Sequence, residues 1–416
     1  MTNMTKHTPQ GYKDSPLGII PKEWEVKRLE DIAVITSGTT PLRSNSNYYN
    51  NGVIPWVKTT DLNNGTLYET EEKVSTEAVE KTSLKILPKG TVLVAMYGGF
   101  RQIGRTALLG IDATINQALS ALMCNSSVES PFVLAWLNCR VNYWKRLAAS
   151  SRKDPNITGN EVAKFPILIP SKEEQSSIVE VLGLWDTAIE KQSELIEKLK
   201  LRKRALIQQL LTGKKRLPGF SGEWKKRTYS NILIEVKRSL NWDENELYNL
   251  ISVRRRSEGL FFRESLYGRD IATKNLRPAK TGDFLISKMQ IVHGASGLVT
   301  DKFDNAKISG SYISLVSKDS NILDIRYYNL WSQMPIFYHQ TFVSSFGVHI
   351  EKMTFDLDTF MSFGMPLPPI DEQHAIVSLI ESINKEIELA NEKLINLQSQ
   401  KRGLMQQLLT GKKRVI

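Results

Sequence analysis

Two stretches of the chain repeat an apolar position at alternating intervals of four and three residues, each for about five heptads. This spacing is that of the a and d positions of a coiled coil, which form its narrow contact stripe. Gln192 and Lys203 interrupt the first stripe; in the second, Lys401 interrupts it and Ala390 stands at the position equivalent to Gln192. The apolar stripe positions are Ile178, Leu182, Trp185, Ile189, Ile196, Leu199, Leu206 and Leu210, then Ile376, Ile380, Ile383, Ile387, Leu394, Leu397, Leu404 and Leu408. We therefore predict two long helices with matching seams.

Signals for the helix ends flank both stripes. Ser171 and Asp371 are candidate N-caps, and Gly213 and Gly411 stand where a C-terminal glycine is expected. Each glycine is followed by Lys-Lys-Arg, which suits the negative end of a helix and equally suits contact with phosphates. Glu174 and Glu372, near the helix starts, are expected to cap backbone N–H groups rather than to act as acids or bases.

The two stretches belong to an internal repeat. The sequence around Leu206–Arg216 recurs at Leu404–Arg414, and the same offset of 198 residues aligns Glu174-Gln175 with Glu372-Gln373. Lys22-Glu23-Trp24 is more loosely matched by Gly222-Glu223-Trp224. The predicted order is an N-terminal arm (1–21), a first globular domain (22–170), a long helix (171–213), a basic linker (214–222), a second globular domain (223–368), a long helix (369–411) and a basic tail (412–416).

The two globular regions have a mixed α+β pattern. Short β-type runs at 92–96, 119–123, 284–287 and 313–316 are separated by Gly, Asn and Pro, and a helical stretch is expected at 132–147. The pattern does not predict a strand order. If the second domain keeps its entry and exit close together, the two long helices run antiparallel and pair within one chain, with one domain at each end.

Composition is that of an ordinary folded protein with a basic excess. Lys and Arg outnumber Asp and Glu by 55 to 44, which gives a net charge of +11 and favours a polyanion, nucleic acid before membrane. The longest apolar runs are too short to cross a bilayer. Two cysteines, Cys124 and Cys139, cannot build a disulfide framework, so we expect a reducing cytoplasm.

Enzyme signatures are not recognisable in the chain. The five histidines lack metal-ligand spacing, and Gly213-Lys214-Lys215 lacks the upstream glycine and the Ser or Thr of a phosphate loop. We therefore expect no catalytic residue, no metal and no cofactor in this chain.

Basic and amide side chains are interleaved with aromatic residues in turn-rich parts of both domains. Such side chains match base edges and neutralise phosphates, although each alone is more often a solvated surface group. The candidate DNA-binding residues are Arg43, Lys58, Arg101, Gln102, Arg105 and Lys153 in the first domain and Arg254, Arg255, Lys274, Lys288, Gln290 and His293 in the second.

The arrangement resembles the specificity subunit of type I restriction–modification enzymes over nearly the whole chain. The resemblance is carried by the opening from Pro21 to Leu29, the entries Pro170–Gln175 and Pro369–Gln373, and the repeated Gln-Gln-Leu-Leu-Thr-Gly-Lys-Lys-Arg. It implies that each globular domain reads one half of a bipartite double-stranded DNA target. It also implies that the helix pair sets the spacer and docks two methyltransferase subunits, with restriction subunits joining them. S-adenosylmethionine, ATP and Mg²⁺ would belong to those partners.

Two other classes of protein share parts of this pattern. A coiled-coil transcription regulator predicts a helix-turn-helix and a stripe between chains, and a stand-alone nuclease or methyltransferase predicts a catalytic constellation. The sequence offers neither feature, so the specificity subunit is the favoured interpretation.

Overall fold

A computed structural model describes residues 8–149, 155–350 and 353–415. The chain forms two units, which are treated one at a time. Unit 1 consists of residues 1–193 and 392–416, and unit 2 of residues 194–391. The long helices α6 (Lys172–Leu211) and α11 (Ile370–Leu408) each give one half to either unit.

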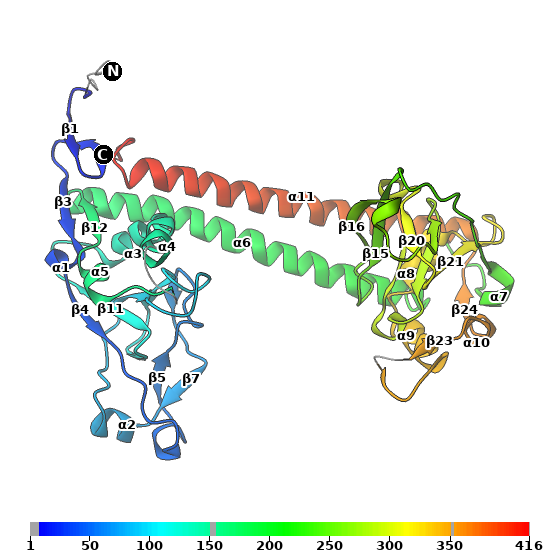
Figure 1. Ribbon diagram of the computed structural model, residues 1–416, viewed down its shortest axis with the longest axis horizontal. Helices are drawn as coiled ribbons and strands as arrows, with labels where there is room; N and C mark the ends of the chain where they lie inside the picture. Colours follow the sequence, from blue (N-terminus) through cyan, green and yellow to red (C-terminus); the bar gives the residue numbers. More distant parts are fainter. Residues whose placement is uncertain (1–7, 150–154, 351–352, 416) are drawn as a thin grey trace. The chain divides into compact units, whose positions relative to one another are not determined.

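Unit 1 is built on a five-stranded sheet of order β4-β11-β8-β9-β6, in which only β6 runs parallel to its neighbour (Figure 1). A three-stranded sheet, β10-β5-β7, and the pairs β12-β3 and β1-β2 complete it. The strands are β1 (Tyr12–Ser15), β2 (Gly18–Pro21), β3 (Glu25–Arg28), β4 (Ala33–Ser37), β5 (Ile54–Val57), β6 (Thr66–Leu67), β7 (Glu72–Val74), β8 (Val92–Ala95), β9 (Thr106–Leu109), β10 (Thr114–Ile115), β11 (Leu119–Cys124) and β12 (Pro166–Ile169). The short helices are α1 (Leu29–Ile32), α2 (Thr76–Lys81), α3 (Ser130–Cys139), α4 (Val141–Ala149) and α5 (Gly159–Ala163).

Unit 2 repeats this plan with a four-stranded sheet of order β14-β21-β18-β19 beside a second sheet of order β16-β15-β20-β17. Its strands are β13 (Lys225–Thr228), β14 (Leu233–Glu235), β15 (Leu247–Val253), β16 (Leu260–Tyr267), β17 (Leu276–Pro278), β18 (Phe284–Ser287), β19 (Ser296–Leu298), β20 (Lys307–Ser309), β21 (Tyr312–Ser317), β22 (Ser345–Phe346), β23 (Thr354–Phe355) and β24 (Gly364–Leu367). Its helices are α7 (Tyr229–Ile232), α8 (Ile325–Trp331), α9 (Pro335–Val343) and α10 (Leu357–Ser362), with a 3-10 turn, η3, at Ile291–His293.

The strand orders reveal the duplication that the sequences of the globular regions hide. The series β4-β11-β8-β9 corresponds to β14-β21-β18-β19, and the pair β12-β3 corresponds to β24-β13. The expected β-type runs at 92–96, 119–123, 284–287 and 313–316 lie on β8, β11, β18 and β21. The predicted mixture of helices and strands is confirmed, and the structure provides the strand order that the sequence pattern did not predict.

The halves of the long helices run antiparallel within each unit. In unit 1, Ile178 and Leu182 of α6 share a hydrophobic core with Leu408 of α11, and Asp186 forms an ion pair with Lys401. In unit 2, the last turn of α6 and the first turns of α11 share the other main core. The stripe positions are buried or half-buried, whereas most positions between them are exposed. This is the burial expected of a packed a/d stripe.

Two local expectations were wrong. The helix expected at 132–147 is interrupted at Arg140, between α3 and α4. Continuing the buried face of α3 through Val133 and Leu137 would carry Arg140 inward, and the break leaves its guanidinium over the Trp136 ring instead, at 4.6 Å. Asp371 is not an N-cap, because α11 already begins at Ile370. Ser171 does cap α6, since its hydroxyl accepts the Glu174 N–H at 3.3 Å.

Candidate nucleic-acid interface

Equivalent loops of the two units carry several of the candidate DNA-binding residues. The connection from β8 to β9 holds Arg101, Gln102 and Arg105, and the corresponding connection from β18 to β19 holds Lys288, Gln290 and His293. The sequence alone does not show that these residues are equivalent, because the two loops differ in both length and composition. The sheet order places them at one structural position on a repeated scaffold.

In unit 1 the loop surrounds a polar hollow of about 400 Å³, whose lining includes Arg101, Arg105 and Lys145. Arg105 donates to the Gln102 side chain at 2.9 Å and to the carbonyl oxygen of Leu62, which fixes the guanidinium in the loop. The Arg101 side chain is exposed beside it. The three cations make this hollow attractive to a phosphate group or to acceptors on a base edge.

Arg43 and Lys58 form a separate cluster around one carboxylate. Glu72 accepts from Arg43 at 2.7 Å and from Lys58 at 2.6 Å, and Lys58 also contacts Glu71 at 3.0 Å. The hydrogen bonds to Glu72 raise the pKa of both cations and lower the pKa of Glu72. Since these charges are compensated internally, they stabilise the loops around β5 and β7 and offer little net attraction to phosphate.

In unit 2 the turn between β15 and β16 lies against η3. The Arg256 N–H donates to the His293 carbonyl at 2.7 Å, and Arg255 Nε donates to Gln290 Oε1 at 2.8 Å. Arg254 is exposed next to them, with its guanidinium 5.1 Å from the Phe261 ring centroid. The structure therefore brings Arg254, Arg255, Gln290 and His293 together, with Lys288 at the start of the same loop.

Two further candidates do not join these clusters. Lys274 forms an ion pair with Glu244, and its ammonium lies 5.7 Å from the Trp242 ring; both partners precede β15 in the chain. Arg254 instead follows the last residue of β15, so Lys274 and Arg254 lie near opposite ends of that strand. Lys153 lies outside the described residues.

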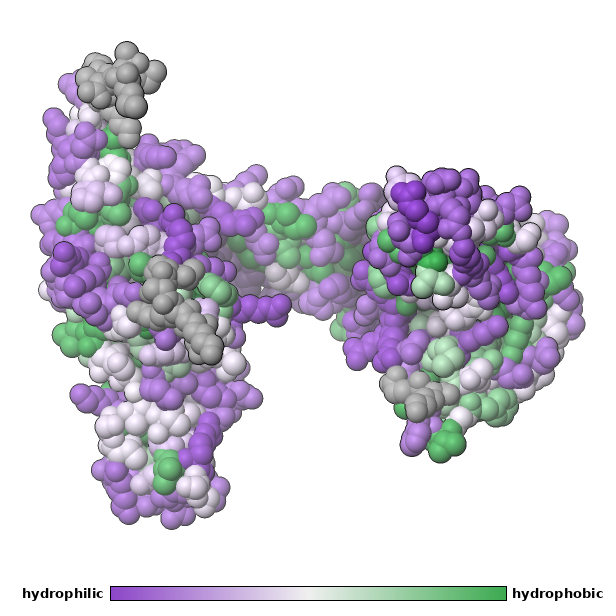
Figure 2. All heavy atoms as spheres, in the orientation of Figure 1, coloured by the Kyte–Doolittle hydropathy of each residue, from purple (hydrophilic) through white to green (hydrophobic). Residues whose placement is uncertain are grey.

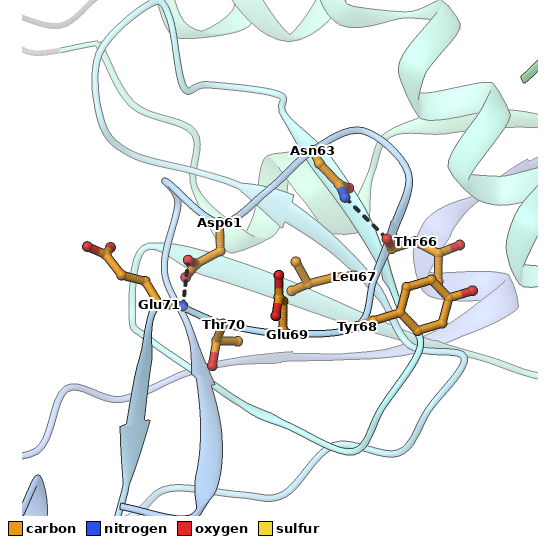
Figure 3. Close-up of a pocket in the computed structure, with 8 residues that line it drawn as sticks. All are labelled: Asp61, Asn63, Thr66, Leu67, Tyr68, Glu69, Thr70 and Glu71. Carbon is orange, nitrogen blue, oxygen red and sulfur yellow. Dashed lines mark hydrogen bonds between the residues drawn. The ribbon is translucent and has the colours of Figure 1, made fainter. Parts of the chain in front are cut away.

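A larger hollow in unit 1, of about 670 Å³, has the wrong charge for nucleic acid. Figure 3 shows Asp61, Glu69 and Glu71 in its lining, with Asp61 accepting the Glu71 N–H at 3.3 Å and Asn63 donating to the Thr66 carbonyl at 3.2 Å. Carboxylates repel phosphate, so this hollow is not part of the interface.

A cluster of Trp, Glu and Arg, which was not predicted from the sequence, joins the ends of the long helices in each unit. We call each cluster a clasp. In unit 1, Glu174 accepts from Trp24 Nε1 at 2.9 Å and from Arg414 at 2.5 and 2.9 Å. Both carboxylate oxygens of the buried Glu174 accept from these side chains in place of the expected backbone cap, so that expectation was wrong.

The clasp in unit 2 has the same chemistry. Glu372 accepts from Trp224 Nε1 at 3.1 Å and from Arg216 at 2.5 and 2.6 Å. The arginine of each Lys-Lys-Arg run is therefore held by a carboxylate at the start of the other helix. The Trp, Glu and Arg all lie in the repeated motifs, but nothing in those motifs indicates that the three side chains meet.

The glutamines next to the clasps fasten each helix to its domain. Gln175 accepts the Glu129 N–H at 2.8 Å and donates to the Pro170 carbonyl at 3.0 Å. Gln373 accepts the Asp324 N–H at 3.0 Å and donates to the Pro368 carbonyl at 2.9 Å. Both side chains are fully buried, so the Glu-Gln pair has a structural explanation.

A metal centre and a membrane-spanning helix are both absent from the described ranges. No cluster of three or more His, Cys, Asp or Glu residues there has metal-binding geometry. Among the helices of those same ranges, none is both long and apolar enough to span a membrane.

The family follows from the repeated sequence itself. The sequence model described as "Type I restriction modification DNA specificity domain" matches residues 21–201 and again residues 223–399. The chain belongs to this family. Each copy of the specificity domain includes one globular region and most of the long helix that follows it.

Individual specificity subunits show the same relationship. The specificity subunit of the type I restriction enzyme MjaIX from Methanocaldococcus jannaschii is 32% identical over 201 residues, which is 46% of this chain and 45% of that protein. The putative MjaX specificity subunit of the same organism is 23% identical over 98% of this chain and 97% of its own length.

A solved structure shares the fold. It is described under the complex assembly and conformational transition of the type I R-M system, and it superposes with a TM-score of 0.61 at 17% identity, covering 95% of this chain and 99% of the solved one. At that identity the likeness shows a shared fold and no more.

Proposed function

We propose that this chain is the non-catalytic DNA-reading subunit of a type I restriction–modification complex. Each globular domain reads one half of a bipartite target in double-stranded DNA. The supporting observation is the pair of equivalent loops, β8–β9 and β18–β19, which present different polar side chains from the same scaffold. A shared scaffold with different loop chemistry suits a protein that reads two unlike sequences.

The long helices are proposed to set the spacing between the half-sites and to dock two methyltransferase subunits. Those partners would supply S-adenosylmethionine chemistry and direct methylation to adenines, and restriction subunits would add ATP- and Mg²⁺-dependent cleavage. The clasps support this role, because they hold the helix ends rigidly to the domains that do the reading.

The exposed apolar residues of the helices are candidates for docking. Leu184 is 67% exposed and Leu195 is 45% exposed, whereas Leu211 and Leu409 near the helix ends are buried in the domain cores. Leu184→Asp should weaken association with the methyltransferase without unfolding the chain. Retained association at wild-type affinity would remove Leu184 from the docking surface.

Reconstitution tests the proposal as a whole. The chain is purified alone and together with a methyltransferase encoded beside it, and adenine methylation of genomic DNA is mapped. We expect methylation at one bipartite sequence only when both proteins are present. Methylation or cleavage by the purified chain alone would contradict the proposal, and specific DNA binding that recruits no methyltransferase would favour a transcription regulator.

Arg101 tests the reading loop. If it contacts a base, Arg101→Ala should cost about 1–3 kcal/mol and relax specificity at one position of one half-site. If Arg101 contacts a phosphate, the substitution should weaken binding to all DNA sequences alike and reduce the salt dependence of the affinity. Arg43→Ala is the matched control, because Arg43 is already paired with Glu72. Equal effects of the two substitutions would argue against a special role for the loop.

A further inference from the structure

Unit 2 carries a short hairpin with an apolar end. Strands β22 and β23 pair antiparallel directly after α9, and the residues at and beyond the end of β22 are hydrophobic and exposed. Phe346 is 58% exposed, Val348 94% and Ile350 50%. Figure 2 shows hydrophobic surface at this edge of unit 2. Exposing three apolar side chains within five residues to water is unfavourable, and a binding partner that covers them would remove this free-energy cost. We call residues 345–350 the apolar finger.

The finger has a rigid root. The Phe355 side chain is buried in the main core of unit 2, and Asp356 N–H donates to the Ser344 carbonyl at 2.8 Å. The Ser345 hydroxyl donates to the Thr341 carbonyl of α9 at 2.7 Å. Because the base of the finger is held in place, its exposed side chains are positioned for contact with another molecule.

The root is bonded to the candidate DNA-reading loop. The Phe355 N–H donates to the Lys288 carbonyl at 3.1 Å, and Lys288 begins the β18–β19 connection. In the same connection, Gln290 Oε1 accepts a hydrogen bond from Arg255 Nε. The neighbouring β15–β16 turn holds three arginines, 254–256, and one acid, Glu258. A cationic surface beside an apolar tip favours a polyanion with an apolar interior, which describes a DNA duplex.

Unit 1 has a different segment at the equivalent place. There the Ile157 N–H donates to the Met96 carbonyl at 2.9 Å, the same link that joins Phe355 to Lys288. Seven residues, 150–156, separate that link from the end of α4, whereas eleven residues, 344–354, separate it from the end of α9. The shorter segment reads Ser-Ser-Arg-Lys-Asp-Pro-Asn, and the longer one begins Ser-Ser-Phe-Gly-Val-His-Ile. The segment in the second domain is thus four residues longer, and its sequence includes Phe346, Val348 and Ile350.

We propose that the apolar finger is a wedge that enters the DNA duplex in the half-site of the second domain and unstacks one base step. Val348 is the inserted side chain, and Phe346 and Ile350 cover the bases on either side. Lys288 and Arg255 hold the flanking phosphates. The inference rests on the proposed function, and it adds that one domain reads DNA deformability as well as base edges. Apolar wedges of this kind kink DNA in proteins that approach the minor groove.

The experiment uses the full chain assembled with its methyltransferase and a duplex that carries the methylation site mapped for that complex. Thymines in unstacked steps are detected by permanganate, and affinity is measured across a salt series. The variants are Val348→Ser and Val348→Lys. The matched control is Ile234→Ser, on β14 of the same unit, where the side chain is 47% exposed.

We expect a reactive thymine in the second half-site with the wild type and with Ile234→Ser. Val348→Ser should abolish it and lower affinity about tenfold without changing the salt slope, because no charge is removed. Val348→Lys should also abolish it. A gain in affinity with a steeper salt slope for Val348→Lys would overturn the proposal, since the tip would then only lie near phosphates.

Two other results would also overturn it. Unchanged affinity and reactivity in Val348→Ser would show that the finger does not touch DNA. Loss of methyltransferase binding with normal DNA reactivity would make it a protein-docking surface. If the wild-type complex methylates no duplex, the proposed function itself is refuted. Methylation by the wild type is therefore measured before any variant is made.

Discussion

The glycines that follow the two long helices have the same backbone conformation but different neighbours. Gly213 and Gly411 both have φ +69°, in the left-handed region that favours glycine. A Cβ at Gly213 would make ordinary van der Waals contact with the Trp224 ring at 3.6 Å, whereas at Gly411 it would come within 2.4 Å of Pro21. The two glycines thus share a backbone conformation and differ in their surroundings.

We expect Gly213→Ala to cost about 1 kcal/mol of unfolding free energy from the backbone alone. Gly411→Ala should cost that amount and a further 1–3 kcal/mol or so, because Pro21 must move. Urea denaturation of the two variants measures the difference. Equal losses would show that the arm around Pro21 yields without cost.

The clasp of unit 1 predicts a second effect at this scale. Arg414→Met leaves the buried Glu174 carboxylate without its two strongest donors, so stability should fall by about 2–4 kcal/mol. Adding Glu174→Gln removes the uncompensated charge and should recover at least half of that loss. Lys413→Met, at an exposed neighbouring position, is the control. A double variant no more stable than Arg414→Met would mean that the ion pair is not the cause.

These residues mark the limit of sequence reasoning. Trp24, Glu174 and Arg414 all stand in the motifs that identified the family, but they are separated by 150 and 240 positions along the chain. Periodicity and capping rules act over a few residues. They could predict that Gly411 ends a helix and could not predict which carboxylate its neighbouring arginine would meet.

Among the elements, the long helices were the most predictable and the domains the least. Alternating apolar spacing and cap residues specify a helix locally, and Ser171, Gly213 and Gly411 behave as expected. The strand order depends on pairings between distant segments, such as Ser120 with Ser37, which leave no local pattern. The break at Arg140 depends on what the core of unit 1 can bury, which the helical pattern alone does not contain.

The seam of the helices also contains a cation. Burial lowers the pKa of Lys203 below its ordinary value of 10.5, because desolvation disfavours the charged form. In the other copy Lys401 has Asp186 as a partner, and the position equivalent to Asp186 is occupied by Asn384. Lys203 therefore lacks the acid that the repeat supplies to Lys401.

Lys203→Met should raise the unfolding free energy by about 0.5–1 kcal/mol at pH 7. With a lowered folded-state pKa, the unfolded chain binds the proton more tightly, so the wild type gains stability as pH rises through the folded pKa toward 10.5. The advantage of the variant should then shrink between pH 7 and pH 10, which denaturation at both values measures. Lys191→Met, at an exposed helix position, should be neutral at both.

For the whole molecule, the proposed function predicts that the two globular domains read DNA independently. Replacing residues 22–165 with the corresponding region of a related specificity subunit should change one half-site and leave the other as it was. Mapping modified adenines by single-molecule sequencing of genomic DNA gives both half-sites at once. Simultaneous change of both halves would contradict independent reading.

The helices predict the spacer. One heptad inserted after Gln192 and another after Ala390 keep the a/d stripe in phase and add about 10 Å of helix. That length equals roughly three base pairs at 3.4 Å each, so the unread spacer should lengthen while both half-sites stay the same. The added base pairs rotate one half-site around the duplex, which should lower activity. An active variant with an unchanged spacer would show that the helices do not set it.

The division of unit 1 into two stretches of chain has a consequence for its synthesis. Residues 194–391 form unit 2 without a break and can fold as soon as they emerge from the ribosome, but unit 1 needs the final 25 residues. At about 5–20 residues per second, the first domain waits roughly 10–45 s for them. During that time Ile178 and Leu182 lack Met405, Leu408 and Leu409, which cover them in the finished fold. A chain that stops before residue 392 would therefore lack part of the domain that is translated first.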